Sequence, residues 1–246
     1  EACEALTADG FEVHRFDGEA PTPEIAQALA RATHVLISIP PDADGDPALR
    51  HHGTNIKAAP GVTWVGYLST TGVYGDTGGA MVDEDSPLAP TSPRSEHRVA
   101  AEAAWRALAP SVPVHVFRLA GIYGPGRSML DRLRAGTAQR ILKPGHLFGR
   151  IHVDDIVQVL KASMARPDPG AVYNVCDDVP AAPAAVVAKA AALLERMAPR
   201  LVPFDDAAKT MSPMALSFWR DNRTVDNRRI KESLGVDLLY PDFKEG

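Results

Sequence analysis

The chain has few cysteines, no long hydrophobic run and no run of basic residues. Only Cys3 and Cys176 are cysteines among 246 residues, which excludes a disulfide framework and favours a reducing compartment, here the cytoplasm. Pro, Gly or a charged residue interrupts every longer apolar stretch, so we expect no segment that spans a membrane. The net charge of -5, with no basic run, argues against a nucleic-acid partner.

Apolar residues make up 45% of the chain, which is enough for a sizeable core, and apolar runs alternate with helical segments. We expect strands at residues 11–16, 34–39, 62–68, 112–119 and 172–175. We expect helices at residues 1–8, 23–32, 94–108, 129–134 and 156–165, with one more ending near 58. The continuous apolar run 34–39 is typical of a strand that is buried on both faces of a parallel sheet. This alternation predicts an α/β fold with a doubly wound, mostly parallel, Rossmann-like sheet.

The composition changes after residue 180. An alanine-rich helix is expected from 181 to 197, followed by a stretch punctuated by proline and a short helix at 228–234. We interpret this part as a smaller C-terminal lobe that accompanies the sheet.

Two short stretches carry most of the functional signal. The first, Ser69-Thr70-Thr71-Gly72-Val73-Tyr74-Gly75, closes the strand at 62–68, and the second, Ser92-Pro93-Arg94-Ser95-Glu96-His97-Arg98, opens a helix. Hydroxyls at a strand end, followed by charges at a helix start, are how an open α/β sheet builds a site at the carboxyl ends of its strands. The long loop 72–92 between them is rich in Gly, Asp and Pro, and such loops are usually functional.

Further motifs follow in order, and together they carry a family resemblance. They are Leu68 to Gly75, Asp83 to Pro93, Arg118-Leu119-Ala120-Gly121-Ile122-Tyr123-Gly124-Pro125-Gly126, Arg150-Ile151-His152-Val153-Asp154-Asp155-Ile156 and Gly170 to Val175. Each motif is weak alone, but five in this order cover about half of the chain. The sequence resembles an extended short-chain dehydrogenase/reductase of the NAD-dependent epimerase/dehydratase superfamily, and most closely its atypical YeeZ-like branch.

The resemblance implies a cofactor, NAD or NADP, and a small-molecule substrate, a sugar nucleotide or a related hydroxylated metabolite. It implies an NAD(P)-binding domain at 1–126, an excursion into the substrate lobe at 127–150, a return at 151–178 and the C-terminal substrate lobe at 179–246. A homodimer is left open. The implied cofactor-binding residues are Ser38, Ile39, Pro40, Ser69, Thr70, Arg98, Leu119, Gly121 and Ile122. The implied substrate-binding residues are Thr71, Tyr74, Arg94, Tyr123, Arg127 and Arg150, and the implied catalytic residues are Thr70, Arg94 and Arg98.

The family's opening strand, glycine loop and helix, which hold the cofactor's pyrophosphate, are not found. A literal G-x-x-G-x-x-G occurs at residues 72–78, but Gly, Asp and Pro follow it instead of the helix that the motif needs. If 11–16 is the family's third strand, about one βαβ unit is missing. That unit either precedes the printed sequence or is absent from a shortened protein.

The family's Tyr-x-x-x-Lys pair is also replaced, with Arg94 and Arg98 at its two positions. An arginine stays protonated and cannot cycle a proton as the tyrosine does. Arg94 could clamp a phosphate or carboxylate and Arg98 could hold ribose hydroxyls, or both could be solvated surface charges. At a spacing of four on one helix we expect both side chains in one cleft.

Few groups can replace the missing acid/base. His97 titrates near neutrality, and Tyr67, Tyr74 and Tyr123 carry hydroxyls, but packing is the commoner role for each. His152 with Asp154 and Asp155 is better explained as a helix cap with a core histidine than as a metal site, so we expect no metal. Two functions therefore stay open: an oxidoreductase or epimerase with an atypical site, or a non-catalytic NAD(P)-binding sensor or regulatory protein.

Overall fold

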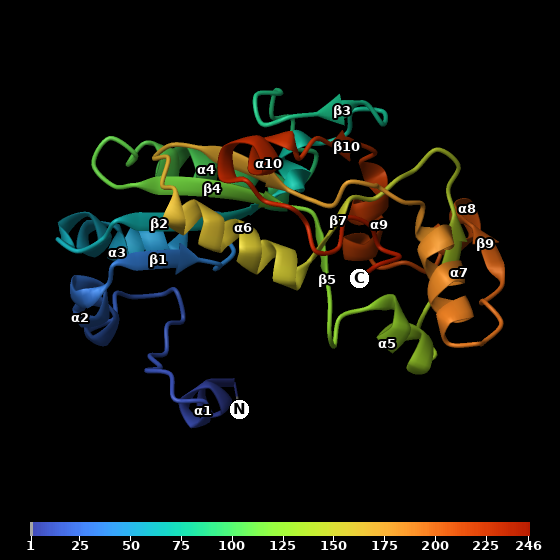
Figure 1. The fold of residues 1–246 in the computed structure, drawn as a ribbon, viewed down its shortest axis with the longest axis horizontal. Helices are drawn as coiled ribbons and strands as arrows, with labels where there is room; N and C mark the ends of the chain where they lie inside the picture. The colour runs from blue at the N-terminus through green and yellow to red at the C-terminus, as the bar shows by residue number, and fades with distance from the viewer. Residues whose placement is uncertain (1) are drawn as a thin grey trace.

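The fold is built on a four-stranded parallel sheet, which lies across the left of Figure 1. The computed structural model describes residues 2–246, with side chains from Cys3. The sheet has the order β1 (His34–Ile37), β2 (Trp64–Thr70), β4 (Val114–Leu119) and β8 (Val172–Val175), and every neighbouring pair is parallel. The predicted α/β class and parallel sheet are confirmed.

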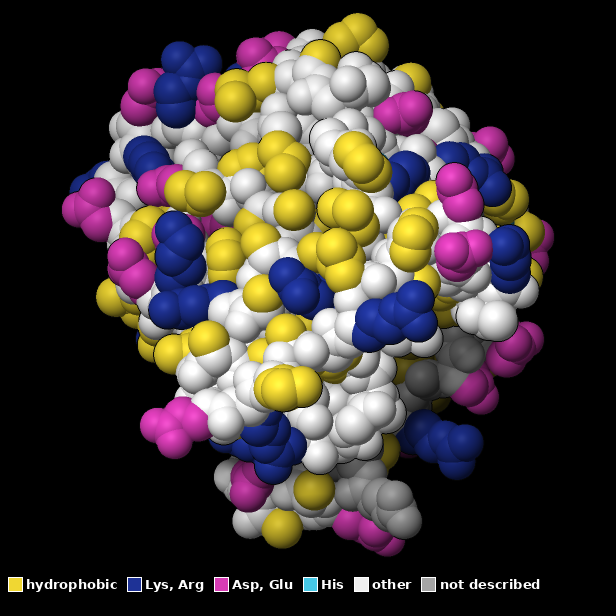
Figure 2. Space-filling view, turned by 90° about the vertical axis from the view of Figure 1, so that its right-hand side faces the viewer, with side chains coloured by type: hydrophobic (Ala, Val, Ile, Leu, Met, Phe, Trp, Pro, Cys, Tyr) yellow, Lys and Arg dark blue, Asp and Glu magenta, His cyan; other side chains and the backbone are white. Residues whose placement is uncertain are grey.

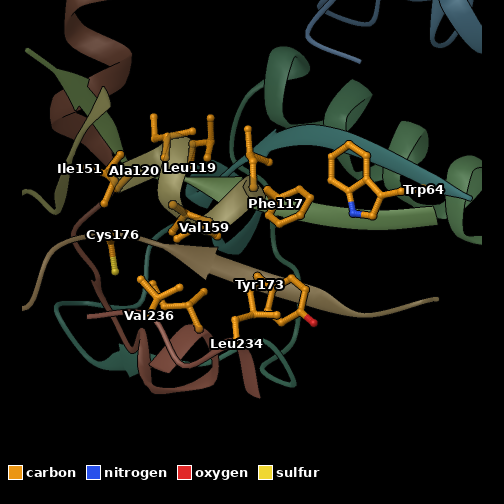
Figure 3. Close-up of a cluster of buried hydrophobic side chains, with 14 residues drawn as sticks. Trp64, Phe117, Leu119, Ala120, Ile151, Val159, Tyr173, Cys176, Leu234 and Val236 are labelled. Atoms are coloured by element: carbon orange, nitrogen blue, oxygen red, sulfur yellow. The ribbon is translucent and has the colours of Figure 1, made fainter. Parts of the chain in front are cut away.

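Helices cover both faces of this sheet, as double winding requires. On one face α3 (Pro47–Ala58) and α4 (Pro93–Arg106) pack on Val65 and Val116, with Trp105 of α4 fully buried. On the other face α6 (Val153–Ala165) and α10 (Arg228–Leu234) pack on Trp64 and Phe117. Figure 3 shows this second cluster, in which residues of β2, β4 and β8 meet residues from the two helices and the C-terminal segment. Because side chains alternate along a strand, the sheet contributes residues to two separate cores, one on each face.

The edge of the sheet differs from the sequence prediction in two ways. β1 is not buried on both faces: its residues alternate between exposed and partly buried, and only Ile37 is buried. The strand expected at 11–16 does not form, since this segment is irregular between α1 (Ala2–Ala8) and α2 (Pro23–Arg31). Both predictions were wrong at the same place: among the described residues β1 pairs only with β2, so β1 is an edge strand rather than a central one, and residues 11–16 do not pair with its open edge.

Beside the sheet lies a second set of elements, at the right of Figure 1, which we call the distal group. It consists of α5 (Met129–Arg134), β6 (Arg140–Leu142), α7 (Pro183–Leu193), β9 (Leu201–Pro203), α8 (Phe204–Ala208) and α9 (Pro213–Arg220). The sequence predicts α5 correctly and α7 with ends several residues too long. The short elements β6, β9, α8 and α9 were missed, because three to eight residues carry too little periodicity to read.

Two further strand pairs join distant parts of the chain. β5 (Gly121–Tyr123) pairs in parallel with β7 (Arg150–His152), and β3 (Met81–Val82) pairs in parallel with β10 (Thr224–Val225). Between β2 and β3 the chain turns through a 3-10 helix, η1 (Thr71–Tyr74), and ends it at Gly75 with a φ of 69°. A Cβ on Gly75 would lie 1.8 Å from the Ala89 carbonyl oxygen, so only glycine fits this turn. No helix in residues 2–246 has the length and apolar character needed to cross a bilayer.

Candidate functional site

A cavity of about 860 Å³ opens at the carboxyl ends of β2 and β4, between the sheet and the distal group. Its sheet side is formed by the end of β2 and η1, by the first turn of α4 and by residues 119–123. Its other side is formed by α5, α7, α9 and the loop that precedes β7. The carboxyl ends of parallel strands are where open α/β sheets bind ligands, so this cavity is the candidate site.

Thr70 brings a hydroxyl to the cavity at the end of β2. Its Oγ1 accepts a hydrogen bond from the Gly72 amide at 3.1 Å, which makes it the cap of η1. This bond uses an oxygen lone pair only, so the hydroxyl proton remains able to donate to a ligand. A Cβ on Gly72 would lie 3.2 Å from Ser95 Oγ and 3.4 Å from Thr70 Oγ1, so the glycine keeps the floor between these two hydroxyls open.

A buried polar network lies directly beneath this floor. The Ser69 hydroxyl donates to Glu102 at 2.5 Å, and Glu102 accepts three hydrogen bonds from the Arg118 guanidinium at 2.8 to 3.2 Å. Arg118 also donates to the Tyr74 hydroxyl at 2.8 Å, and that hydroxyl donates to Asn174 at 2.7 Å. Burial raises the pKa of Tyr74 to about 12. The hydroxyls of Ser69 and Tyr74 are therefore occupied within the protein and do not line the cavity.

The structure separates Arg94 and Arg98, the two arginines in the first half of α4. Arg94 is exposed, lines the cavity and has no hydrogen-bond or ion-pair partner within residues 2–246. Arg98 is 9% exposed and lies outside the lining, because its guanidinium donates to the Leu68 carbonyl at 2.7 Å and to the Tyr67 hydroxyl at 3.1 Å. Glu102, one turn further on, pairs with Arg118 rather than with Arg98. Arg94 is thus the one of the pair that can reach a ligand in the cavity.

Tyr123, Arg127 and Arg150 lie on the side of β5 and β7. Tyr123 packs edge-on against His152 with ring centroids 5.1 Å apart, and burial raises its pKa. Arg127 is exposed at the cavity rim. The Nη1 atom of Arg150 donates to the carbonyls of Phe148 and Ala181, at 2.9 and 3.3 Å, and burial lowers the pKa of this guanidinium.

The cavity therefore brings together most of the residues that the sequence singles out, namely Thr70, Thr71, Arg94, Leu119, Gly121, Ile122, Tyr123, Arg127 and Arg150. Ser38, Ile39, Pro40, Ser69, Tyr74 and Arg98 lie outside its lining. The sequence gives no sign of the distal wall, where Phe148, Val186 and Trp219 face the cavity. It does carry a sign of the buried network, since Arg118 is the one charged side chain, and His115 the only other polar one, in a strand of apolar residues.

A model of the NAD dependent epimerase/dehydratase family matches residues 54–176, which include β2, α4, β4 and β8. The chain belongs to this family. Protein YeeZ of Escherichia coli K12 is 31% identical over 179 residues, which are 72% of this chain and 58% of YeeZ. The chain thus matches less than two thirds of that relative's length.

Solved structures share the fold of this chain. A functionally unknown conserved protein from Silicibacter pomeroyi is 54% identical, with a TM-score of 0.89 over 98% of this chain and 83% of its own. A dTDP-glucose 4,6-dehydratase from Bacillus anthracis in complex with NAD has a TM-score of 0.72 at 19% identity, covering 94% and 74%. The human epimerase family protein SDR39U1 with NADPH has a TM-score of 0.70 at 19% identity, covering 89% and 83%.

The residues present fit one half of the dinucleotide that the epimerase/dehydratase family implies. Thr70, Gly72 and Gly121 border the cavity at the strand ends, where a nicotinamide ring would need hydroxyl donors and close backbone approach. For the diphosphate half, the described residues do not provide the glycine loop and helix N-terminus that the family uses to bind it. The loop after β1 carries Asp42 and Asp44, and Asp46 caps α3 through the Leu49 amide, so acidic groups stand where a helix N-terminus would otherwise favour an anion.

Hydrogen bonds within the protein engage both His152 and Asp155. The His152 Nδ1 atom accepts from the Asp154 amide as the cap of α6, which matches the predicted role. The buried Asp155 carboxylate accepts from the amides of Leu239 and Tyr240 at 2.7 and 3.1 Å. These bonds fix the C-terminal segment against α6, where Phe243 adds to the cavity wall.

Proposed function

We propose that the protein binds NAD or NADP and acts as an oxidoreductase or epimerase on a small hydroxylated metabolite, a sugar nucleotide in the family's usual chemistry. The observation that carries this proposal is the cavity at the carboxyl ends of β2 and β4, bordered by the Thr70 hydroxyl and the Gly121 backbone. The bound nucleotide would supply hydride transfer. The chain itself would orient the reacting oxygen through Thr70 and hold an anionic group through Arg94.

Proton transfer needs a group other than the family's tyrosine, whose place Arg94 takes. Tyr123 is the one tyrosine in the cavity lining within residues 2–246. Burial raises the pKa of Tyr123, so its hydroxyl stays protonated at neutral pH and is also a weaker acid than a free tyrosine. Tyr123 would therefore act mainly as a hydrogen-bond donor to the reacting oxygen.

The alternative is a non-catalytic NAD(P)-binding sensor or regulatory protein. One observation favours it: Arg94 is exposed and carries a permanent charge at the position where the family places its acid/base. A positioned acid/base is typically worth about 10²–10⁴-fold in rate, so its loss weakens the ordinary mechanism without abolishing binding.

Calorimetry on the full-length protein tests the shared part of both functions. We expect NAD(H) or NADP(H) to bind, and failure of all four at millimolar concentration would refute the proposal. A spectrophotometric assay of nicotinamide oxidation with keto-sugar nucleotides then separates the two. Turnover that Tyr123→Phe abolishes supports the enzyme, whereas binding without turnover supports the sensor.

The Arg94→Ala variant tests the anion clamp. Losing a charged hydrogen bond should weaken binding of the phosphate-bearing ligand by about 1.5–3 kcal/mol. The melting temperature should not change, because Arg94 has no partner within residues 2–246. Arg134→Ala is the matched control, since Arg134 is a 56% exposed arginine on α5 that does not line the cavity. Equal affinity in wild type and Arg94→Ala would show that Arg94 is surface charge only.

A further inference from the structure

The distal wall of the cavity offers little to a hydroxyl-rich ligand. Helix α7 has the sequence PAAVVAKAAAL, in which Lys189 is the single polar side chain, and Val186, Lys189, Ala190 and Leu193 line the cavity. A site that recognises a sugar needs neutral or charged groups to pair with its hydroxyls, since unpaired buried polar groups are costly. The α7 wall instead favours an apolar body.

Aromatic residues continue this apolar wall. The rings of Phe148 and Trp219 meet edge-on at 5.3 Å, and Trp219 packs on Phe204 at 5.4 Å. Phe218 of α9 also lines the cavity and is 58% exposed. Figure 2 looks onto this side of the molecule, where hydrophobic side chains gather with Lys and Arg side chains between them.

The wall has few neutral polar groups, and two of them are engaged elsewhere. The Ser128 hydroxyl donates to Asp131 in the cap of α5, and the Ser217 hydroxyl donates to the Met214 carbonyl of its own helix. Gln139 and the indole N–H of Trp219 are the neutral polar groups of the distal wall that have no hydrogen bond within residues 2–246. The other polar side chains of this wall that are not engaged in this way, Arg132 and Lys189 among them, are charged, so the wall has few neutral partners for the several hydroxyls of a hexose.

Arg150 supplies a charge at the inner end of this wall. Its Nη1 atom is held by the carbonyls of Phe148 and Ala181. Its Nε and Nη2 atoms have no acceptor, and the guanidinium forms no ion pair, within the described part of the chain. Burial lowers the pKa of Arg150, and the nearby carboxyl of Asp177, which accepts from the Arg150 amide at 3.2 Å, opposes that shift.

The position of Arg150 links the apolar wall to the reacting end of the cavity. Arg150 is paired with Gly121 across β5 and β7, and a Cβ on Gly121 would lie 4.0 Å from Arg150 Cγ. Ala181, which accepts from Arg150, lies two residues before α7. An anion on Arg150 would therefore have Gly121 on one side and the apolar wall on the other.

We propose that the substrate of this cavity is an anion with an apolar body, a carboxylic or phosphoric acid carrying a hydrocarbon or aromatic group, with its anion on Arg150 and its body against Phe148, Trp219 and α7. This inference rests on the proposed function, because it names the substrate of the same site. It replaces the hydroxylated sugar by an apolar group and keeps the nicotinamide end unchanged.

Calorimetry with a ligand series tests this proposal on the full-length protein. Butyrate, hexanoate and octanoate share an anion and differ in body, octanol has the body without the anion, and octyl phosphate exchanges the anion. Burial of each methylene contributes about 0.8 kcal/mol, so affinity should rise about fourfold per methylene. Comparison of octanoate with octyl phosphate identifies which acid the site prefers. UDP-glucose provides the sugar-nucleotide arm.

Two variants locate the two parts of the ligand. Arg150→Gln should weaken octanoate about tenfold or more through the lost charged hydrogen bond, and leave octanol unchanged, while Arg134→Gln should change neither. Phe218→Ser should weaken octanoate and octanol equally. Because Phe218 is largely exposed, this variant remains informative if Arg150→Gln does not fold.

The outcomes separate this inference from the proposed function. Affinity that does not depend on chain length, or tight binding of UDP-glucose with no binding of any alkanoate, overturns the apolar-anion proposal even where NADH binds. Burial of the same wall against a second copy, seen as a dimer by light scattering that Phe218→Ser dissolves, also overturns it. Octanoate binding without any nicotinamide nucleotide binding overturns the proposed function and leaves the apolar-anion site standing.

Discussion

Removing the carboxylate of Glu102 should be among the most damaging single changes in the chain. Glu102 and Arg118 each have a side chain that is only 2% exposed, and three hydrogen bonds join them. In Glu102→Leu the guanidinium keeps its bonds to the Tyr74 hydroxyl and the Glu84 carbonyl but loses its only counter-charge among the described residues. Leaving one partner of a buried ion pair uncompensated typically costs 3–5 kcal/mol.

Urea unfolding followed by tryptophan fluorescence measures this cost, because Trp64 and Trp105 are fully buried. Glu96→Leu is the control: Glu96 is exposed on the same helix, and its replacement should change the free energy of unfolding by about 0.5 kcal/mol or less. The double variant Glu102→Leu with Arg118→Met should recover most of the loss, since an apolar pair can replace a buried ion pair. A loss below about 1 kcal/mol in Glu102→Leu, or a double variant as unstable as the sum of the singles, would refute the reasoning.

Two further changes test other parts of the structure. Burial raises the pKa of Asp177 to about 7, and its Oδ2 atom has no hydrogen-bond partner among the described residues. Asp177 in the folded state therefore keeps a proton that it releases near pH 4 in the unfolded state. The free energy of unfolding should therefore fall by up to about 4 kcal/mol as the pH rises from about 4 to 7. Urea titrations at several pH values should show that Asp177→Asn removes this fall. If the pH dependence is unchanged in Asp177→Asn, other groups cause it. Gly75→Ala should lower the melting temperature, because a Cβ there would lie 1.8 Å from the Ala89 carbonyl oxygen and the φ of 69° is strained for alanine. Gly78→Ala is the control, because a Cβ at Gly78 meets open space and only the positive φ is strained. Equal losses of melting temperature in the two variants would contradict the steric clash at Gly75.

The central sheet could be predicted because local sequence patterns indicate most of its strands. β4 and β8 are buried at every residue, and their sequences are mostly apolar, as is typical of strands covered on both faces. The helices α3 and α4 begin at Pro47 and Pro93, and Pro is common at the first position of a helix. The strand at 11–16 failed because a strand depends on a neighbour, which local pattern does not reveal.

The candidate site was only partly predictable for a similar reason. The spacing of Arg94 and Arg98 predicts a shared helix face, but the free carbonyl of Leu68 and the hydroxyl of Tyr67 draw Arg98 beneath the strand end. These acceptors are thirty residues away in the sequence. The distal wall around Phe148 and Trp219 depends on contacts between residues about seventy apart, and no periodicity reports them.

The parallel pairing of β3 with β10 has a consequence for the order in which the molecule assembles. Met81 and Val82 meet Thr224 and Val225 across more than half of the chain, and the Asn222 carbonyl accepts from Thr77 and Gly79. Contacts of such long sequence separation form late, because the entropy of closing the intervening loop must first be overcome. A ribosome that has synthesised the whole sheet, through Val175, has still not supplied the residues that hold the loop between β2 and α4. The cleft is therefore completed only after residues 222–225 have emerged, and until then the nascent sheet carries an unfinished cavity.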